Sequence, residues 1–146
     1  MEKVIVKVRG QQTDAAGETD KMEVVAEGRH YYRNGKHYVV YSEDAKQAAK
    51  SSTMLKIAPD SMILFRKGEI AYEQFFQKDR EVTSEFNTPY GTLDLSVKTR
   101  NLEIVYGTTS GNIDIDYALS IDGKWQADHE LHIEIEAHPD DVGKLN

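Results

Sequence analysis

Residues 86–106 read FNTPYGTLDLSVKTRNLEIVY and contain the longest clean run of alternating apolar and polar residues in the chain. Leu93, Leu95 and Val97 alternate with polar residues, which is the period-two pattern of a strand with one buried face. Pro89 lacks a backbone donor and Gly91 tolerates unusual dihedral angles, so residues 88–91 are expected to bend or bulge the sheet. We expect this stretch to form central strands of a β-barrel.

The length and charge of the chain limit the protein classes to consider. With 146 residues, the chain can bury a core without disulfides or metal, and we expect one domain over residues 1–146 with a polar tail at 138–146. The net charge of -7 argues against nucleic-acid binding, because such proteins gather Lys and Arg into a basic stripe. The nearest basic cluster, residues 29–36, is interrupted by tyrosines and a turn, although Arg beside aromatic rings is also typical of a stacking platform.

Cysteine content and the N-terminal sequence predict the compartment. The chain has no cysteine, which excludes disulfides and a thiolate metal site and fits a reducing environment. The N-terminal residues MEKVIVKVRG are charged and alternating rather than forming an apolar signal segment, and no stretch approaches the length of a membrane span. We therefore expect a cytoplasmic protein that does not contact a membrane.

Short strands separated by turn signals account for most of the chain. A first strand is predicted around residues 4–9, a loop over residues 11–19 and a second strand from Met22. Ser42–Ser52 is the stretch with good helix formers, and we expect it to form one or two helical turns or a long loop. From Thr53 onwards strands resume and are joined by tight turns.

Asn34-Gly35 is the strongest hairpin signal and predicts a two-residue type I′ turn. This turn places Arg33 opposite Lys36 and His30 opposite Val39. One face of the hairpin then carries His30, Tyr32, His37 and Val39. Gly28, just before the hairpin, is expected to let its strand bend.

The register of the last hairpin depends on the loop at Asp122-Gly123. A two-residue loop would pair Ile115 with Glu130, so we predict a three-residue loop, residues 121–123, which pairs Leu119 with Trp125. On the outward face this register pairs acidic residues with one another, Asp116 with Asp128 and Asp114 with Glu130. A register shifted by two residues would instead pair Asp114 with His132.

About eight to ten short strands joined mostly by tight turns predict a meander. A meander with one consistently apolar face tends to close and so remove its edges. The expected fold is all-β, a single closed antiparallel β-barrel with at most one short helix, because no connection is long enough for a crossover helix between parallel strands.

The chain resembles the YwiB-like family of bacterial proteins in four motifs, namely RKG at 66–68, FF at 75–76, TPYGTLDL at 88–95 and KT at 98–99. The hairpin YYRNGKHYVVYSED at 31–44 and the segment GNIDIDYAL at 111–119 extend the resemblance over most of the chain. It implies a calycin-like, lipocalin-like β-barrel in a family regarded as a domain of unknown function. The motifs are structural, so the resemblance supplies no catalytic residue.

The eight tyrosines supply aromatic rings with polar tips, which suit a small-molecule pocket at the barrel mouth or interior but also simply fill barrels. Arg66 would bind a carboxylate or phosphate of the ligand, or merely pair with Glu69 across a turn. A barrel packed solid beside Arg66 or Tyr72 would exclude an interior ligand and leave a protein-interaction role for the outer face. The candidate ligand-binding residues are His30, Tyr32, Tyr41, Arg66, Tyr72 and Tyr90.

A different class of function would use the acidic hairpin at residues 114–136. Carboxylates gathered on one face suit a divalent cation, and with a histidine they suit a metal-assisted or acid-base hydrolase. The weak metal-site alternative consists of Asp114, Asp116, Glu130 and His132. Our prediction is a non-catalytic module that binds a small molecule or a protein partner, uses no cofactor and is a monomer or weak homo-oligomer.

Overall fold

The computed structural model of the protein describes residues 1–42, 52–68 and 71–139. Ten β-strands lie within these residues. They are β1 (Glu2–Asp14), β2 (Thr19–Arg33), β3 (Lys36–Tyr41), β4 (Ser52–Ile57), β5 (Ser61–Lys67), β6 (Tyr72–Gln77), β7 (Glu81–Thr88), β8 (Gly91–Tyr106), β9 (Gly111–Ile121) and β10 (Lys124–Ala137).

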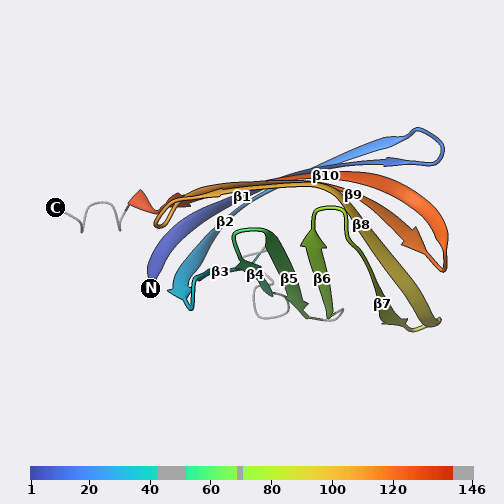
Figure 1. The fold of residues 1–146 in the computed structure, drawn as a ribbon, viewed down its shortest axis with the longest axis horizontal. Helices are drawn as coiled ribbons and strands as arrows, with labels where there is room; N and C mark the ends of the chain where they lie inside the picture. The colour runs from blue at the N-terminus through green and yellow to red at the C-terminus, as the bar shows by residue number, and fades with distance from the viewer. Residues whose placement is uncertain (43–51, 69–70, 140–146) are drawn as a thin grey trace.

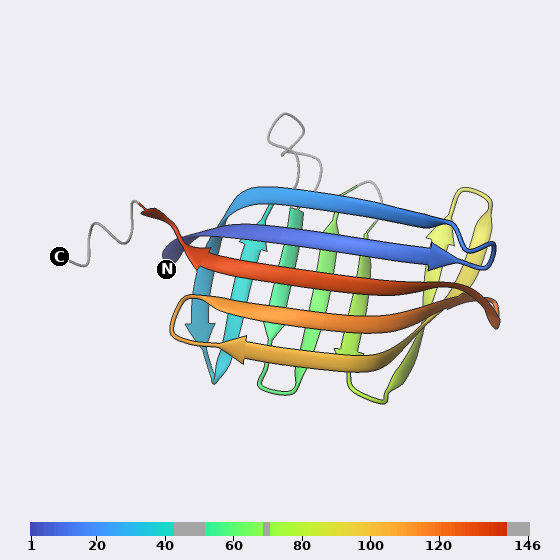
Figure 2. The ribbon, with the colours of Figure 1, turned by 90° about the horizontal axis from the view of Figure 1, so that it is seen from above.

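The strands form one antiparallel sheet that curls into a nearly closed barrel (Figure 1). Consecutive strands pair with each other except for β6 and β7, and the first strand pairs with the last, β1 with β10. Seen from above, β1, β10 and β9 run across the shorter strands β3 to β6 (Figure 2). The predicted all-β antiparallel barrel of eight to ten strands is therefore confirmed.

The seam of the barrel lies between β6 and β7, which are consecutive in the chain but not hydrogen-bonded neighbours. The turn between them is held against β8, because the Asp79 N–H donates to the Thr99 carbonyl at 2.8 Å and the Thr99 N–H donates to the Arg80 carbonyl at 3.0 Å. Further along the seam, the rings of Tyr72 and Phe86 meet edge-on with centroids 6.1 Å apart. Backbone hydrogen bonds thus connect the β6–β7 turn to β8, and farther along the seam the contact is between side chains.

The stretch at residues 86–106 lies at the seam and not at the centre of the sheet, so the expectation of central strands is wrong. It forms the end of β7, a two-residue turn at Pro89 and Tyr90, and the whole of β8. Because β1 pairs with β10, the middle of the chain is displaced to the two edges of the sheet. Residues 88–91 reverse the chain direction, with Thr88 paired to Gly91.

The core is formed by the inward faces of the strands. A register shift between Thr99 and Asn101 marks a β-bulge, which switches the inward face of β8 from odd to even residues. Val97 therefore packs in the same core as Ile104 and Tyr106. The largest fully buried side chains are Phe76, Leu55, Ile57, Met62, Ile113, Ile115, Ile133, Ile135, His30, Val4, Val6 and Val39.

The β2–β3 hairpin has the predicted turn and register. Asn34 and Gly35 both have positive φ, 54° and 77°, as a type I′ turn requires. Arg33 pairs with Lys36, and His30 pairs with Val39. Gly28 lies where β2 passes close to β3, and a Cβ at this position would lie 2.7 Å from the Val40 carbonyl oxygen.

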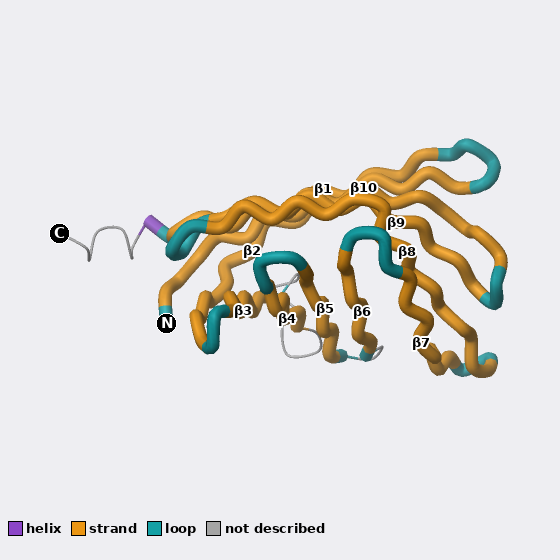
Figure 3. The backbone as a smooth tube through the Cα atoms, viewed as in Figure 1, coloured by secondary structure: helices purple, strands orange, loops and turns teal. Residues whose placement is uncertain are grey.

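Two predicted loops differ from the structure. The loop expected over residues 11–19 shrinks to residues 15–18, because Asp14 Oδ1 accepts hydrogen bonds from the N–H groups of Ala16 and Glu18 at 2.9 Å each. The β1–β2 hairpin consequently stays extended almost to its tip and projects away from the β9–β10 hairpin (Figure 3). Its composition suggested a loop, but pairing with β10 as far as Asp14 keeps it extended.

The loop between β9 and β10 has two residues, so the three-residue prediction is wrong. Ile121 pairs with Lys124, and a β-bulge between Trp125 and Ala127 then shifts the register. Leu119 pairs with Ala127 in place of Trp125. The bulge restores apolar pairing without a longer turn, and it produces the alternative register in which Asp114 faces His132.

Two regions complete the chain. The helix or loop expected over Ser42–Ser52 falls largely on residues 43–51, outside the described residues, as does most of the polar tail, residues 140–146. In the described part of the chain, no helix is long and apolar enough to cross a membrane.

Candidate functional sites at the two ends of the barrel

A chain of hydrogen-bonded side chains lies at the barrel end that carries the β2–β3 and β8–β9 turns (Figure 2). His30 is 1% exposed, and its Nδ1 lies 3.0 Å from Glu2 Oε2. Its other ring nitrogen, Nε2, lies 2.9 Å from His37 Nδ1. We call Glu2, His30, His37 and Tyr106 the histidine cluster.

Aromatic stacking holds the histidine cluster in place. The ring of Tyr106 stacks on the ring of His37 with centroids 3.9 Å apart. The ring of Tyr32 also contacts His37, in a tilted arrangement with centroids 4.8 Å apart. The Tyr106 hydroxyl donates to the Thr109 carbonyl at 2.9 Å. Gly111 is needed beside this ring, because a Cβ there would overlap Tyr106. Side chains from β2, β3 and β8 therefore pack together in one polar and aromatic cluster.

The hydrogen bonds fix the chemistry of the histidine cluster. A carboxylate only accepts, so His30 donates to Glu2 through Nδ1, and one proton lies between His30 Nε2 and His37 Nδ1 in the second hydrogen bond. Burial lowers the pKa of His37, His30 lowers it further, and Glu2 acts in the opposite direction. Burial and Glu2 raise the pKa of Tyr106. Both ring nitrogens of buried His30 are thus bonded, and the partly exposed Glu2, His37 and Tyr106 cover it at this end of the barrel.

The opposite end, which we call the mouth, carries the turns at residues 15–18, 89–90 and 122–123 (Figure 1). An apolar groove of about 190 Å³ lies at the seam between β6 and the β7–β8 hairpin. A second groove of about 330 Å³ shares Tyr72, Phe86 and Leu95 with it. We call the first of these the seam groove; its lining residues are Tyr72, Gln74, Phe86, Leu93, Leu95, Leu119 and Ile121.

A further cavity of about 250 Å³ lies under the projecting β1–β2 hairpin, and we call it the mouth cavity. Its lining includes inward-facing residues of β1, β2, β9 and β10, among them Gln12, Met22, Tyr117, His129 and Leu131. Tyr117 stacks almost parallel on His129, with ring centroids 4.7 Å apart. Burial raises the pKa of Tyr117, and the nearby Tyr72 contributes in the same direction. Tyr117 therefore lies near both the seam and the mouth cavity.

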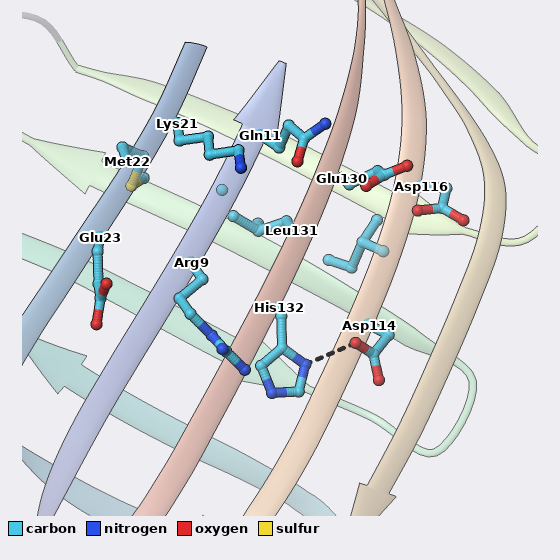
Figure 4. Close-up of a pocket in the computed structure, with 12 residues that line it drawn as sticks. Arg9, Gln11, Lys21, Met22, Glu23, Asp114, Asp116, Glu130, Leu131 and His132 are labelled. Atoms are coloured by element: carbon cyan, nitrogen blue, oxygen red, sulfur yellow. Dashed lines mark hydrogen bonds and ion pairs between the residues drawn. The ribbon is translucent and has the colours of Figure 1, made fainter. Parts of the chain in front are cut away.

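The outer face of β1, β2, β9 and β10 carries a charged groove of about 660 Å³ (Figure 4). His132 Nδ1 lies 2.6 Å from Asp114 Oδ1, and Figure 4 shows Arg9 on the other side of the imidazole. Asp116 pairs with Glu130 in the neighbouring row. Among residues 1–42, 52–68 and 71–139, no three His or carboxylate side chains are close enough to hold a metal ion. The acidic hairpin thus forms ion pairs, and its four candidate ligands do not converge.

Comparison with known proteins identifies the family. Residues 6–133 match the family described as "Domain of unknown function (DUF1934)". The chain belongs to this family. The crystal structure of ywiB protein from Bacillus subtilis is similar, with a TM-score of 0.81 and 21% identity over 94% of this chain and 92% of that chain. At this identity the likeness shows the fold alone, and a comparison with curated proteins found no match.

The family description names no function, so the function has to be inferred from the geometry of the candidate sites. The six predicted ligand residues do not form one site. His30 and Tyr32 belong to the closed end, whereas Tyr72 lines the seam groove and pairs across strands with Arg66. Tyr41 is buried in the core and Tyr90 is fully exposed on its turn. The sequence thus located residues at both ends of the barrel without showing that they lie apart.

Several site residues were missed from the sequence. His37 was placed on the right face by its pairing with Tyr32 but was not chosen as a site residue. Glu2 and Tyr106 lie far from it in sequence, and only the closed sheet brings them together. His129 carried a usable signal, because it interrupts the apolar inward series of Ala127 and Leu131.

Proposed function

We propose that this protein is a non-catalytic binding module that takes up a small, largely apolar molecule at the seam groove. The observation that carries the proposal is the space beside Tyr72, where the inward faces of β6, β8 and β9 do not fill the barrel. Binding pockets are typically concave and mostly apolar, with few polar groups. The lining fits this description, since Gln74 is its one amide among aliphatic and aromatic side chains.

The size and position of the groove favour a small molecule. Drug-sized pockets have volumes of roughly 300 to 1,000 Å³, so the two adjoining grooves at Tyr72 suit a ligand at the lower end of this range. The seam is also the place where the barrel can widen most easily, because β6 and β7 share no ladder of backbone hydrogen bonds. A ligand entering there would cover apolar area at roughly 25 cal/mol per Å².

Fluorescence titration with N-phenyl-1-naphthylamine, an uncharged apolar probe, tests the proposal. We expect saturable binding by the wild-type protein and at least about tenfold weaker binding by Leu95→Gln, which places an amide in the groove. Val105→Gln is the matched control, because Val105 lies on the same strand but is 71% exposed on the outer face. The proposal fails if the wild-type protein shows no saturable binding or if both variants weaken it equally.

A further inference from the structure

The mouth cavity contains an imidazole whose hydrogen bonds are not made within the protein. Across the described ranges, the buried side-chain polar atoms that lack a partner are His129 Nε2 and Thr99 Oγ1. His129, Tyr117 and Thr99 lie side by side on β10, β9 and β8. Buried polar groups in native proteins are nearly always paired, so an unpaired imidazole beside a cavity needs a physical explanation.

The burial of Nε2 decides which nitrogen carries the proton. An orphaned buried N–H is rarer in proteins than an under-used acceptor, so the bare lone pair belongs on Nε2 and the proton on Nδ1. Nδ1 is not among the buried unpartnered atoms of the described residues, and His129 lines the cavity, so we take Nδ1 as the ring nitrogen that a molecule in the cavity can reach. Burial also lowers the pKa of His129, with Asp128 opposing, which keeps the ring neutral. His129 therefore offers one N–H donor.

We propose that the mouth cavity is a second binding site, and that it takes a small uncharged molecule whose carbonyl or hydroxyl oxygen accepts a hydrogen bond from His129 Nδ1. Met22 and Leu131 supply apolar contact for the rest of the ligand. A volume of about 250 Å³ is many times the roughly 30 Å³ that one water occupies in the liquid. The cavity thus has room for an organic molecule with a single polar anchor.

The charges around the cavity favour an uncharged ligand. Among its inward-facing lining residues the one charged side chain is the carboxylate of Asp20, because Lys21 and Glu130 lie in the outward-facing rows shown in Figure 4. An anionic ligand would meet this net negative lining and a neutral histidine. A cationic ligand would find no acceptor at Nδ1, because that nitrogen donates. This site is independent of the seam groove, whose lining shares no residue with it.

Acetophenone and α-methylstyrene form a matched pair of probes, because they have nearly the same shape and differ in C=O against C=CH₂. Histidine ring nitrogens observed by long-range ¹H–¹⁵N NMR report the tautomer and the site directly. We expect His129 as the Nδ1–H tautomer, a shift of its Nδ1 resonance with acetophenone, and about three- to tenfold tighter binding of acetophenone than of α-methylstyrene. His129→Phe should remove this preference while retaining the ring against Tyr117.

The result can overturn the proposal in three ways. His129 could be found as the Nε2–H tautomer, both probes could bind equally, or neither could shift the His129 resonance at saturating concentration. The last outcome would mean that only ordered water fills the cavity. The wild-type resonances carry the test on their own if His129→Phe does not fold. Because the readout is His129 itself, a probe bound at the seam groove gives no signal, and failure of one proposal leaves the other standing.

Discussion

Replacing His129 with Phe should stabilise the protein, because folding buries Nε2 without a hydrogen-bond partner. An unsatisfied buried polar group costs roughly 1 to 3 kcal/mol. Phe removes this atom and can keep the parallel stacking on Tyr117, at a ring distance of 4.7 Å. We expect the free energy of unfolding to rise by about 1 kcal/mol near pH 8, the low end of that range since Phe is slightly larger. The corresponding rise in Tm is roughly 3 °C.

The gain should grow as the pH falls. Burial lowers the pKa of His129 below its ordinary value, so the unfolded chain takes up the proton at a higher pH than the folded protein. Stability linked to this group is present above about pH 6.5 and is lost as the pH falls below it. Phe cannot be protonated, so the variant loses less. His37, whose pKa is also lowered, remains and leaves part of the pH dependence in place.

Urea unfolding followed by far-ultraviolet circular dichroism at about pH 5.5 and pH 8 measures both effects. Circular dichroism is preferable to fluorescence because Trp125, the single tryptophan, lies only four residues from His129. His132→Gln is the control, since it removes a histidine from the outer face without touching the cavity interior. If His129→Phe lost stability at pH 8, or kept the full pH dependence of the wild type, the assignment of an unsatisfied neutral imidazole would be wrong.

Three further substitutions test the architecture. Gly28→Ala should destabilise by about 2 kcal/mol in urea unfolding, because its Cβ would lie 2.7 Å from the Val40 carbonyl oxygen, and a wild-type midpoint would contradict that close approach. His30→Ala should cost about 3 kcal/mol in the same assay, since it opens a cavity and leaves the Glu2 and His37 groups unpaired; a loss under about 1 kcal/mol would show that the cluster is not formed. Asp114→Asn should cost at most about 1 kcal/mol, and about 1 M salt should shrink the effect; a larger, salt-independent loss would mean that the ion pair with His132 is not a surface contact.

Local signals in the sequence predicted local structure correctly. The Asn34-Gly35 turn fixes its own register because both residues tolerate positive φ, and nothing distant competes with it. The Asp122-Gly123 turn is equally local, yet its register was predicted wrongly. A bulge between Trp125 and Ala127 shifts the pairing after the turn. The apolar residues on both sides of this bulge occupy odd positions, so the bulge leaves little trace in the apolar periodicity.

The bulge in β8 did leave a trace. Apolar residues occupy odd positions up to Val97 and even positions from Leu102, and such a parity switch within one strand requires an extra residue between them. At the same bulge, Thr99 makes the backbone hydrogen bonds that connect the β6–β7 turn to β8. Which strands lie at the seam was not predictable, because that depends on whether β1 pairs with β10, a contact between residues over a hundred positions apart.

The candidate sites were only partly predictable for a related reason. Six polar or aromatic residues were chosen for their chemistry, but chemistry alone does not say which end of a barrel a residue occupies. Tyr72 was chosen because an aromatic ring with a polar tip suits a pocket, and it lines the seam groove; its role in ligand binding stays a prediction. Glu2 could not be found, because its partner His30 is reached only after β1 and β2 pair over their full length.

The two ends of the barrel use histidines in opposite ways, and this contrast supports a binding role for the mouth. At the closed end, both ring nitrogens of His30 are bonded within the protein. At the mouth, His129 is stacked on Tyr117, and its Nε2 is buried without a hydrogen-bond partner among the described residues. Phe would pack there without that penalty, so folding alone gives no reason for an imidazole at this position. A hydrogen bond from Nδ1 to a bound ligand would give one, because Phe at this position could not donate it.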